Sequence, residues 1–261
     1  MRDAPPAPPP VALVTGAAVR VGRAITEALA GAGYRVWIHY HRSKAKAGAL
    51  ADALPLVRDL PSLPVVEADL HDASARRRLM ETVLATSGPA AGRLDLLVNN
   101  AAGFERGAFT ERDDDDLRRV LELNLVAPLS LARDAAPTLR RHRGTIVNIL
   151  DVAGVHPWPE YLDHCTAKAA LLAATRGLAV ELAPIRVNGV APGTVAWPEG
   201  LDRPEHRRAI EDEIPLGHIG TPHDVAQAVL FFAGSRHVTG QILAVDGGRL
   251  AAAGGRRPRA E

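Results

Sequence analysis

A loop that contains two glycines lies near the start of the chain and could bind a phosphate group. It reads Thr15-Gly16-Ala17-Ala18-Val19-Arg20-Val21-Gly22 and follows a short apolar run of strand type. Gly16 permits a tight turn, and Gly22 allows the helix that follows to pack close to the strand. The first turn of that helix offers unpaired N–H groups and the positive end of its dipole to an anion. We therefore predict that Gly16, Arg20, Val21 and Gly22 bind the diphosphate of a dinucleotide cofactor.

The loop after the second apolar run indicates which dinucleotide is bound. Sites for NAD usually place Asp or Glu here, where the carboxylate binds the ribose 2′-hydroxyl. No carboxylate occurs between Trp37 and Ala51, and the run ends instead in Tyr40-His41-Arg42-Ser43. A guanidinium, an imidazole and a hydroxyl suit a 2′-phosphate, to which Arg20 could add a second cation. We therefore predict NADPH as the cofactor; the alternative interpretation is an ordinary solvated basic loop.

Two later loops carry further candidates for contact with the cofactor. Asp69-Leu70 follows the third apolar run, and its carboxylate could accept a hydrogen bond from the adenine amino group. Asn99-Asn100-Ala101 follows the fourth run, and we expect Asn100 and Ala101 to line the nucleotide. Because Asn is also common in ordinary turns, neither segment identifies a site by its residues alone.

Short apolar runs alternate with longer helical patterns along the chain, and these elements must position the loops. Helices are predicted over Arg20–Ala30, Leu117–Leu139 and Tyr161–Leu182. Strands are predicted at Val11–Thr15, Arg35–Tyr40, Pro64–Glu67, Leu94–Val98, Thr145–Leu150, Ile185–Val190 and Gln241–Val245. This alternation predicts an α/β fold: a single Rossmann-type, doubly wound parallel sheet of about seven strands with helices on both faces. Ligands bind such sheets beyond the carboxyl ends of the strands, so the loops named above should meet there.

Composition and charge exclude several classes of protein. The 261 residues carry 31 basic and 30 acidic side chains, so no excess charge attracts nucleic acid or an anionic membrane. The single cysteine, Cys165, excludes an intramolecular disulfide, and no apolar run is long enough to span a bilayer. We expect one domain over residues 11–250, disordered tails at 1–10 and 251–261, and a cytoplasmic location. Asp113–Asp116 is interpreted as a solvated helix start, and no metal site is predicted.

The order and spacing of these segments resemble the short-chain dehydrogenase/reductase family from Val11 to Gly248. The matching segments are the glycine loop, Asn99-Asn100-Ala101, Asn124, Lys168, Pro192-Gly193 and Asp246-Gly247-Gly248. The resemblance implies that Lys168 orients the nicotinamide ribose and that Asn124 holds a water in a chain of proton donors. It also implies that Pro192 and Gly193 contact the cofactor.

Four details are similar to pteridine reductases within that family. They are Arg20 in place of a glycine, the stretch from His39 to Ser43, Asp151 in place of a catalytic serine, and Trp197-Pro198-Glu199. This resemblance implies reduction of a pteridine or dihydrofolate-like ring. It places Asp151 beside the ring as an acid and Phe104 stacked on it. Arg20, Tyr161 and Trp197 are the other predicted substrate contacts, and residues 197–214 are predicted to form a lid helix.

One position departs from the family's pattern. The family has a catalytic tyrosine four residues before the lysine, whereas this chain has His164 there and Tyr161 seven residues before Lys168. All three side chains share one helix face. A free imidazole titrates near pH 6.5, so His164 could donate a proton near neutral pH without a large shift of its pKa. We predict His164 as the donor; the alternatives are Tyr161 or a loss of activity.

Two other functions remain open from the sequence. The same family includes 3-oxoacyl- and enoyl-carrier-protein reductases, and some of the latter space Tyr and Lys as Tyr161 and Lys168 are spaced. A catalytically weak NADP-binding sensor or partner protein is the third hypothesis, which His164 alone supports. The resemblance further implies a small-molecule substrate and a homodimer or homotetramer assembled through the two long helices.

Overall fold

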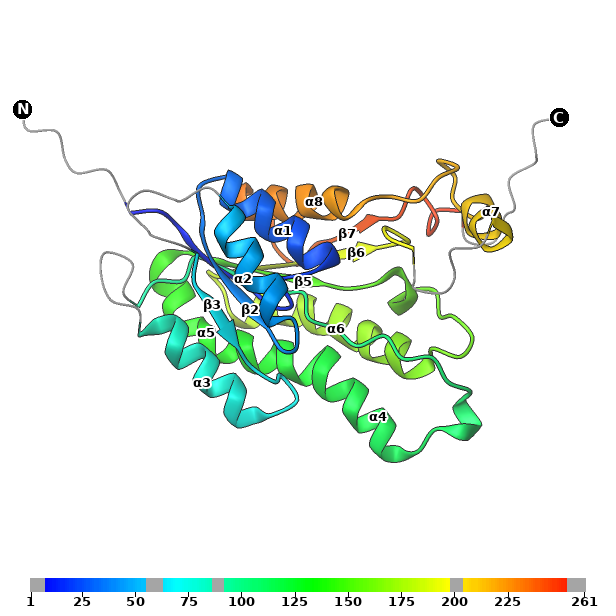
Figure 1. Cartoon of the computed structure of the whole chain (residues 1–261), viewed down its shortest axis with the longest axis horizontal. Coiled ribbons are helices and arrows are strands. Elements are labelled where there is room, and N and C mark those ends of the chain that lie inside the picture. The colour runs from blue at the N-terminus through cyan, green and yellow to red at the C-terminus, as the bar shows by residue number, and fades with distance from the viewer. Residues whose placement is uncertain (1–7, 55–62, 86–91, 198–203, 253–261) are drawn as a thin grey trace, which may run out of the picture.

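The computed structural model describes residues 8–54, 63–85, 92–197 and 204–252. These residues form one parallel sheet of seven strands with helices on both faces (Figure 1). The strand order is β3-β2-β1-β4-β5-β6-β7, and every neighbouring pair is parallel. The predicted Rossmann-type, doubly wound sheet is therefore confirmed.

Each predicted run overlaps one strand, and the ends differ by at most two residues. The strands are β1 (Val11–Val14), β2 (Arg35–Tyr40), β3 (Val65–Glu67), β4 (Leu96–Asn99), β5 (Thr145–Ile149), β6 (Arg186–Pro192) and β7 (Ile242–Val245). The chain builds outward from β1 to β3 and then returns to the other side of β1 with β4. The carboxyl ends of β1 and β4 therefore lie side by side, where sheets of this kind bind ligands.

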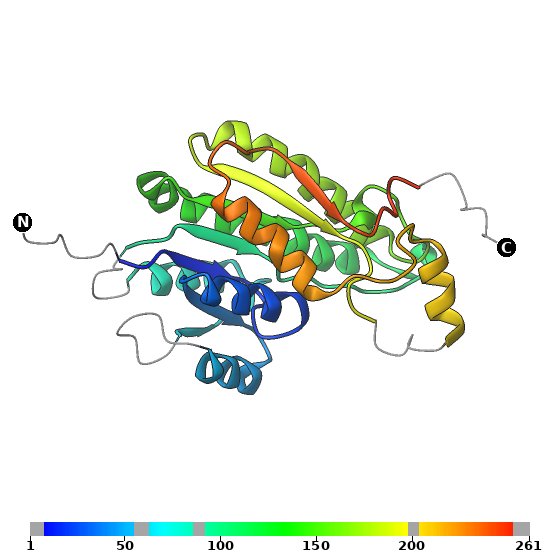
Figure 2. The same ribbon diagram turned by 90° about the horizontal axis from the view of Figure 1, so that it is seen from above.

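Apolar side chains of the central strands alternate between the two faces of the sheet. In β1, Ala12 and Val14 pack with helices α1 (Arg20–Gly31), α2 (Lys44–Ala53) and α8 (Pro222–Gly234). Val11 and Leu13 pack on the opposite face with α3 (Ala73–Leu84), α5 (Ala127–His142) and α6 (Leu162–Glu181). The short helix α7 (Pro204–Asp212) lies beyond the carboxyl ends of β6 and β7 (Figure 2). Helices cover both faces, so only the loops at the strand ends are open to a ligand.

The helix predicted over Leu117–Leu139 is interrupted. It consists of α4 (Asp114–Leu121), a π-helical turn at Glu122–Val126, and α5. The wider turn carries Asn124, which is buried. Such π-helical turns are rare and often lie at functional sites. The start of α4 agrees with the prediction, because Asp113 and Asp116 form a reciprocal capping box.

The ends of the chain are only partly within the described residues. The carbonyl of Pro10 accepts a hydrogen bond from the Arg35 N–H at 2.8 Å, and that of Pro8 accepts one from Arg93 Nη1 at 3.1 Å. The last residues of the predicted tail, Pro8 and Pro10, thus form hydrogen bonds with the domain. Residues 1–7 and 253–261 lie outside the described residues. Among the helices of the described part, none has the length and apolar character needed to cross a bilayer.

Candidate active site

The glycine loop leaves the carboxyl end of β1 in a conformation that requires its glycines. Gly16 has a φ of +61°, in the left-handed region that favours glycine. A Cβ on Gly22 would lie 2.1 Å from the Gly16 carbonyl oxygen. The first turn of α1 contains no acidic residue, and its N-cap, Val19, makes no side-chain cap. The N–H groups of this turn are thus available to a phosphate, and the loop fits the diphosphate of the predicted cofactor.

A buried histidine holds this loop against its neighbours. His39 Nδ1 accepts a hydrogen bond from the Gly16 N–H at 3.0 Å. Nε2 must then carry the proton that it donates to the Ala68 carbonyl, 3.1 Å away. Burial lowers the pKa of His39 to about 4, so the ring is neutral at physiological pH. The sequence analysis missed this role, since His39 was noted only as part of a longer stretch.

The loop after β4 holds the glycine loop from the other side. The side-chain amide of Asn100 donates to the carbonyls of Thr15 at 2.8 Å and of Gly16 at 3.2 Å. The backbone N–H groups of Asn100 and Ala101 both donate to Thr15 Oγ1 at 2.9 Å. Asn100 therefore shapes the phosphate loop through its amide. This role of Thr15 was not predicted, although Thr15 is the last residue of the predicted strand and the first of the glycine loop.

Substitution of Gly22 tests this loop directly. A Cβ there must displace the backbone of Gly16, so Gly22→Ala should weaken NADPH binding about tenfold or more. Gly31→Ala is the matched control, because it lies in the same helix and its Cβ would meet nothing within 4 Å. Calorimetric titration with NADPH measures both variants. Equal affinity of the two would show that the loop does not bind the cofactor.

The residues at the end of β2 do not all face the same way. Tyr40 is buried, and its hydroxyl donates to Glu67 Oε2 at 3.1 Å, so this predicted contact serves the sheet. His41 and Arg42 are exposed. Ser43 is the N-cap of α2 but makes no side-chain cap, and the first turn of α2 holds no acidic residue. The exposed guanidinium of Arg42, the imidazole of His41 and the free helix end together form a suitable place for a phosphate.

Asp69 lies beside this cationic group at the end of β3. Its Oδ1 accepts hydrogen bonds from the backbone N–H and from the ring Nδ1 of His71, each at 3.0 Å. The hydrogen bond from the His71 backbone lowers the pKa of Asp69 more than the hydrogen bond from the His71 ring does. His41 and Asp69 line a pocket of about 360 Å³ against α3. The pocket suits a base such as adenine; Leu70, the other candidate here, is buried.

A second group of predicted residues meets at the carboxyl ends of β4 and β5. His164 lies in the first turn of α6, and Asp151 directly follows the buried Leu150 beyond β5. His164 Nε2 lies 3.2 Å from Asp151 Oδ2, and Nδ1 lies 3.1 Å from the carbonyl oxygen of Gly103. The other carboxylate oxygen of Asp151 accepts the Ala153 N–H at 2.8 Å. Asp151, the predicted acid, and His164, the predicted proton donor, are therefore hydrogen-bonded to each other.

The hydrogen bonds of His164 determine where its protons lie. The carbonyl of Gly103 can only accept, so Nδ1 must carry a proton. The contact between Nε2 and Asp151 then needs one further proton, which either group can hold. The side chain of His164 is 3% exposed, whereas that of Asp151 is 21% exposed. Asp151 is thus the member of the pair that an incoming molecule can reach.

Lys168 lies one turn beyond His164 on α6 and is buried. Its Nζ donates to the Ile149 carbonyl at 2.9 Å. Burial lowers the pKa of Lys168 to about 8, and the nearby Asp151 carboxylate opposes that shift. A cation held in this way is poised to change its charge close to neutral pH.

Asn124 joins this group through the same carbonyl. Its side-chain amide nitrogen donates to the carbonyls of Gly103 at 3.2 Å and Val120 at 3.0 Å. Its Oδ1 is buried and has no hydrogen-bond partner among the described residues. Since buried polar atoms are normally paired, this oxygen has the chemistry to hold a water or a ligand donor.

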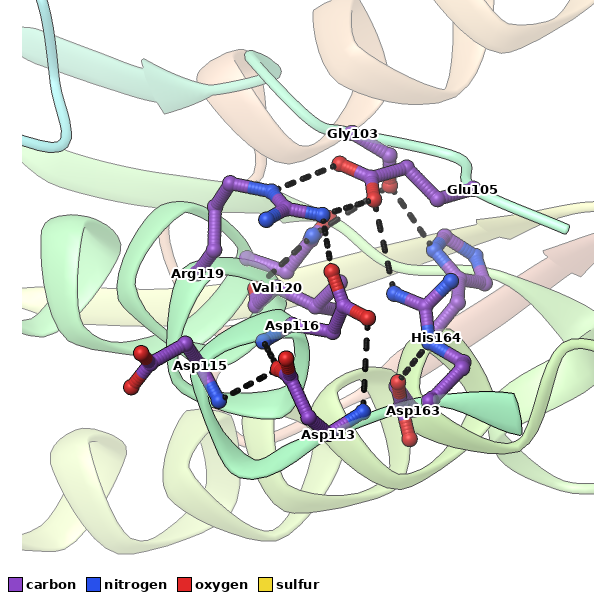
Figure 3. Close-up of polar contacts among 11 residues, drawn as sticks. Gly103, Glu105, Asp113, Asp115, Asp116, Arg119, Val120, Asp163 and His164 are labelled. Atoms are coloured by element: carbon purple, nitrogen blue, oxygen red, sulfur yellow. Dashed lines mark hydrogen bonds and ion pairs between the residues drawn. The ribbon is translucent and has the colours of Figure 1, made fainter. Parts of the chain in front are cut away.

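Ion pairs fix the loop that carries Gly103 (Figure 3). Arg119 of α4 donates to Glu105 at 2.7 Å and to Asp116 at 2.7 Å. Arg112 donates to the largely buried Asp163 at 2.5 Å, on the residue just before His164. The loop is therefore fastened to both α4 and α6, which holds the Gly103 carbonyl in place.

Aromatic rings cover this group on one side. Phe104 is half-exposed and stacks on Tyr161, with ring centroids 4.3 Å apart and planes at 19°. The edge of His164 lies against the same ring, 4.9 Å between centroids. Trp158, which the sequence analysis missed, lies edge-on to Phe104 at 6.3 Å. These four residues form what we call the aromatic cluster: Phe104, Trp158, Tyr161 and His164.

The structure does not bring every predicted residue to this cluster. Trp197 has the Arg207 guanidinium of α7 over its ring at 5.0 Å, and Trp158 takes the place beside Phe104 instead. Pro198 and Glu199 lie outside the described residues, as does part of the predicted lid. Arg20 is exposed at the start of α1 with a φ of +50°. Pro192 is buried, and the Gly193 N–H donates to the Val245 carbonyl at 2.9 Å.

The chain is similar to known proteins along most of its length. The signature of the family described as enoyl-(acyl carrier protein) reductase matches residues 16–249. A putative ketoacyl reductase 2 of the granaticin polyketide synthase of Streptomyces violaceoruber is 35% identical, over 94% of this chain and 97% of that protein. Pteridine reductase 1 of Leishmania tarentolae is 34% identical, over 92% of this chain and 96% of that protein. A blue fluorescent protein from a metagenomic library, solved in complex with NADPH, is similar with a TM-score of 0.82 and 31% identity. That match covers 92% of this chain and 97% of the solved chain.

Proposed function

The chain belongs to the short-chain dehydrogenase/reductase family, and on that premise we propose that it is an NADPH-dependent reductase of a pteridine or dihydrofolate-like ring. When bound, NADPH supplies a hydride from its nicotinamide. The protein must hold the cofactor, orient the substrate and deliver one proton.

The glycine loop and the end of β2 hold the two ends of the cofactor. Gly16, Arg20, Val21 and Gly22 surround the diphosphate, which the free N–H groups of α1 bind. Arg42 and Ser43 bind the 2′-phosphate, with Asp69 and Leu70 near the adenine. Lys168 orients the nicotinamide ribose, and the segment from Pro192 to Gly193 completes the wall beside it.

Arg42 should determine the preference for NADPH. We expect the unmodified protein to bind NADPH at least about tenfold more tightly than NADH, about 1.4 kcal/mol. Arg42→Ala should remove most of that preference and leave NADH binding nearly unchanged. Arg236→Ala removes the same charge from an exposed loop at the opposite edge of the sheet, and it should change neither affinity. Equal binding of both cofactors by the unmodified protein would defeat the assignment.

The bonded pair of Asp151 and His164 carries the substrate proposal. A hydride added to a ring carbon of a C=N group must be matched by a proton on the adjacent nitrogen. Asp151, the more exposed member of the pair, delivers that proton, and His164 replaces it through their 3.2 Å contact. Phe104 stacks on Tyr161 and is still half-exposed, so this pair of rings offers an aromatic surface beside which a heteroaromatic ring can pack.

Reduction of an acyl-carrier thioester is the second candidate. It is favoured by the similarity to the granaticin ketoacyl reductase and by the spacing of Tyr161 and Lys168. Two contacts weigh against the enoyl-reductase hypothesis, in which Tyr161 is the proton donor. Tyr161 precedes the first turn of α6 and lies flat on Phe104, and Lys168 Nζ is bonded to the Ile149 carbonyl.

One set of assays separates these proposals. The oxidation of NADPH is followed at saturating cofactor with dihydrobiopterin, dihydrofolate, and acetoacetyl and crotonyl thioesters. We expect the highest kcat/KM with one of the two pterins. A higher kcat/KM with a thioester would replace the pterin proposal with the second candidate. Tight NADPH binding without turnover of any of the four would support the sensor hypothesis.

We also propose a homodimer or homotetramer, formed through α4, α5 and α6. These elements leave three large apolar side chains exposed. Leu117 lies on α4, Val126 on the π-helical turn between α4 and α5, and Leu162 at the start of α6.

A further inference from the structure

An arginine lies at the outer end of the aromatic cluster. Arg249 follows β7, and its guanidinium carbon lies 5.2 Å from the centroid of the Trp158 ring. Its Nη2 forms an ion pair with Glu213, just beyond α7. The side chain of Arg249 is 20% exposed, whereas that of Glu213 is 59% exposed. A cation largely enclosed by protein is thus paired with a carboxylate that water surrounds.

This pairing leaves most of the guanidinium unused. Arginine has five N–H donors in a planar fork, and two of them can bind the two oxygens of one carboxylate. Among the described residues, Nη2 of Arg249 is the donor with a side-chain partner. Glu213 is the exposed partner, and an exposed carboxylate gains little free energy from an ion pair, so a carboxylate of a ligand can replace it at small cost.

The aromatic cluster connects this arginine to the bonded pair. Trp158 lies 6.3 Å from Phe104, and Phe104 lies 4.9 Å from His164, both between ring centroids. His164 is bonded to Asp151. A substrate whose reacting ring lies at Asp151 and Phe104 would extend past Trp158 toward Arg249. Trp158 is itself held, because its backbone N–H donates to the buried Cys165 sulfur.

We propose that Arg249 and Trp158 form a subsite for the carboxylate-bearing aromatic tail of a folate-like substrate. This inference rests on the proposed function and narrows it to rings with an anionic aryl tail rather than a short neutral one. The tail's aromatic ring packs at Trp158, and its carboxylate binds the guanidinium fork in place of Glu213.

Binding to the full chain with NADP⁺ bound tests the subsite. Folate carries the anionic aryl tail, and biopterin has the same ring system with a short neutral tail. We expect Arg249→Gln to weaken folate binding about tenfold and to change biopterin binding less than twofold. Glu213→Gln should strengthen folate binding alone, because it removes the competing carboxylate. Arg236→Gln, on an exposed loop, is the charge-matched control.

The binding results distinguish failure of the subsite from failure of the proposed function. An equal loss of folate and biopterin affinity in Arg249→Gln, with cooperative thermal unfolding retained, would show a structural role and overturn the subsite. Unchanged folate affinity would overturn it as well. If the unmodified protein binds neither ligand and turns over a thioester, the proposed function fails, and the subsite fails with it.

Discussion

Replacing Lys168 with alanine should lower turnover by two or more orders of magnitude, as the loss of a positioned catalytic group typically does. The buried Nζ is held at the Ile149 carbonyl, next to the carboxylate of Asp151. Under the proposed assignment, the variant loses both the contact with the nicotinamide ribose and the positive charge near Asp151. Lys168→Met keeps the length of the side chain and avoids an empty space in the core, so it should remain folded. Near-normal kcat in either variant, with native circular dichroism, would remove Lys168 from the site.

The pKa of Lys168 gives this prediction a pH dependence. Burial lowers the pKa to about 8, so the cation is lost as the pH rises through that value. NADPH affinity should therefore fall above about pH 8 in the unmodified protein and stay flat in Lys168→Met. Stability should move in the opposite direction. Because the pKa in the folded state is below that of the unfolded chain, near 10.4, the unfolded state binds more protons between these values. The free energy of unfolding should rise with pH across that window in the unmodified protein only.

Asp151→Asn and His164→Ala should each lower turnover by two or more orders of magnitude, with the substrate that the assays identify. The two side chains share one proton in a 3.2 Å contact, so removing either one breaks the same delivery route. The double variant should therefore be little worse than the single variants, as expected for residues that act as a unit. Losses that multiply in the double variant would show that the two residues act separately.

Two further variants distinguish the possible donors. Tyr161→Phe should lose little activity, because the ring keeps its stacking on Phe104. His164→Tyr should keep or raise activity, because the family has a tyrosine at this spacing from Lys168. It should also extend activity to higher pH, since a phenol stays protonated longer than an imidazole. A fully active His164→Ala together with an inactive Tyr161→Phe would make Tyr161 the donor and favour the enoyl-reductase function.

Local patterns in the sequence were enough to predict the elements and several loops. The seven strands could be located because each is a short, largely apolar run. The central strands β1 and β4 are buried along their whole length, whereas the edge strands β3 and β7 are partly exposed. The glycine loop could be located because its backbone geometry depends on residues a few positions apart. The helix start at Asp113 was predicted for the same reason, since the two partners of its capping box, Asp113 and Asp116, lie three positions apart. The interrupted helix at Asn124 was missed because a π-helical turn follows from packing that no local apolar pattern encodes.

The contacts that make the site depend on residues far apart in the chain, and only the tertiary structure decided them. The sequence alone placed His164 on a helix face with Lys168 and proposed it as a free donor. The fold brought Gly103 and Asp151 to its two ring nitrogens, which ties its proton to a carboxylate. The fold also brought His39 Nδ1 to the Gly16 N–H and the Arg249 guanidinium to the Trp158 ring. The physical reason is that a parallel sheet gathers the carboxyl ends of all its strands at one edge. Which side chains meet there is set by strand order and loop packing, and neither leaves a periodic signal in the sequence.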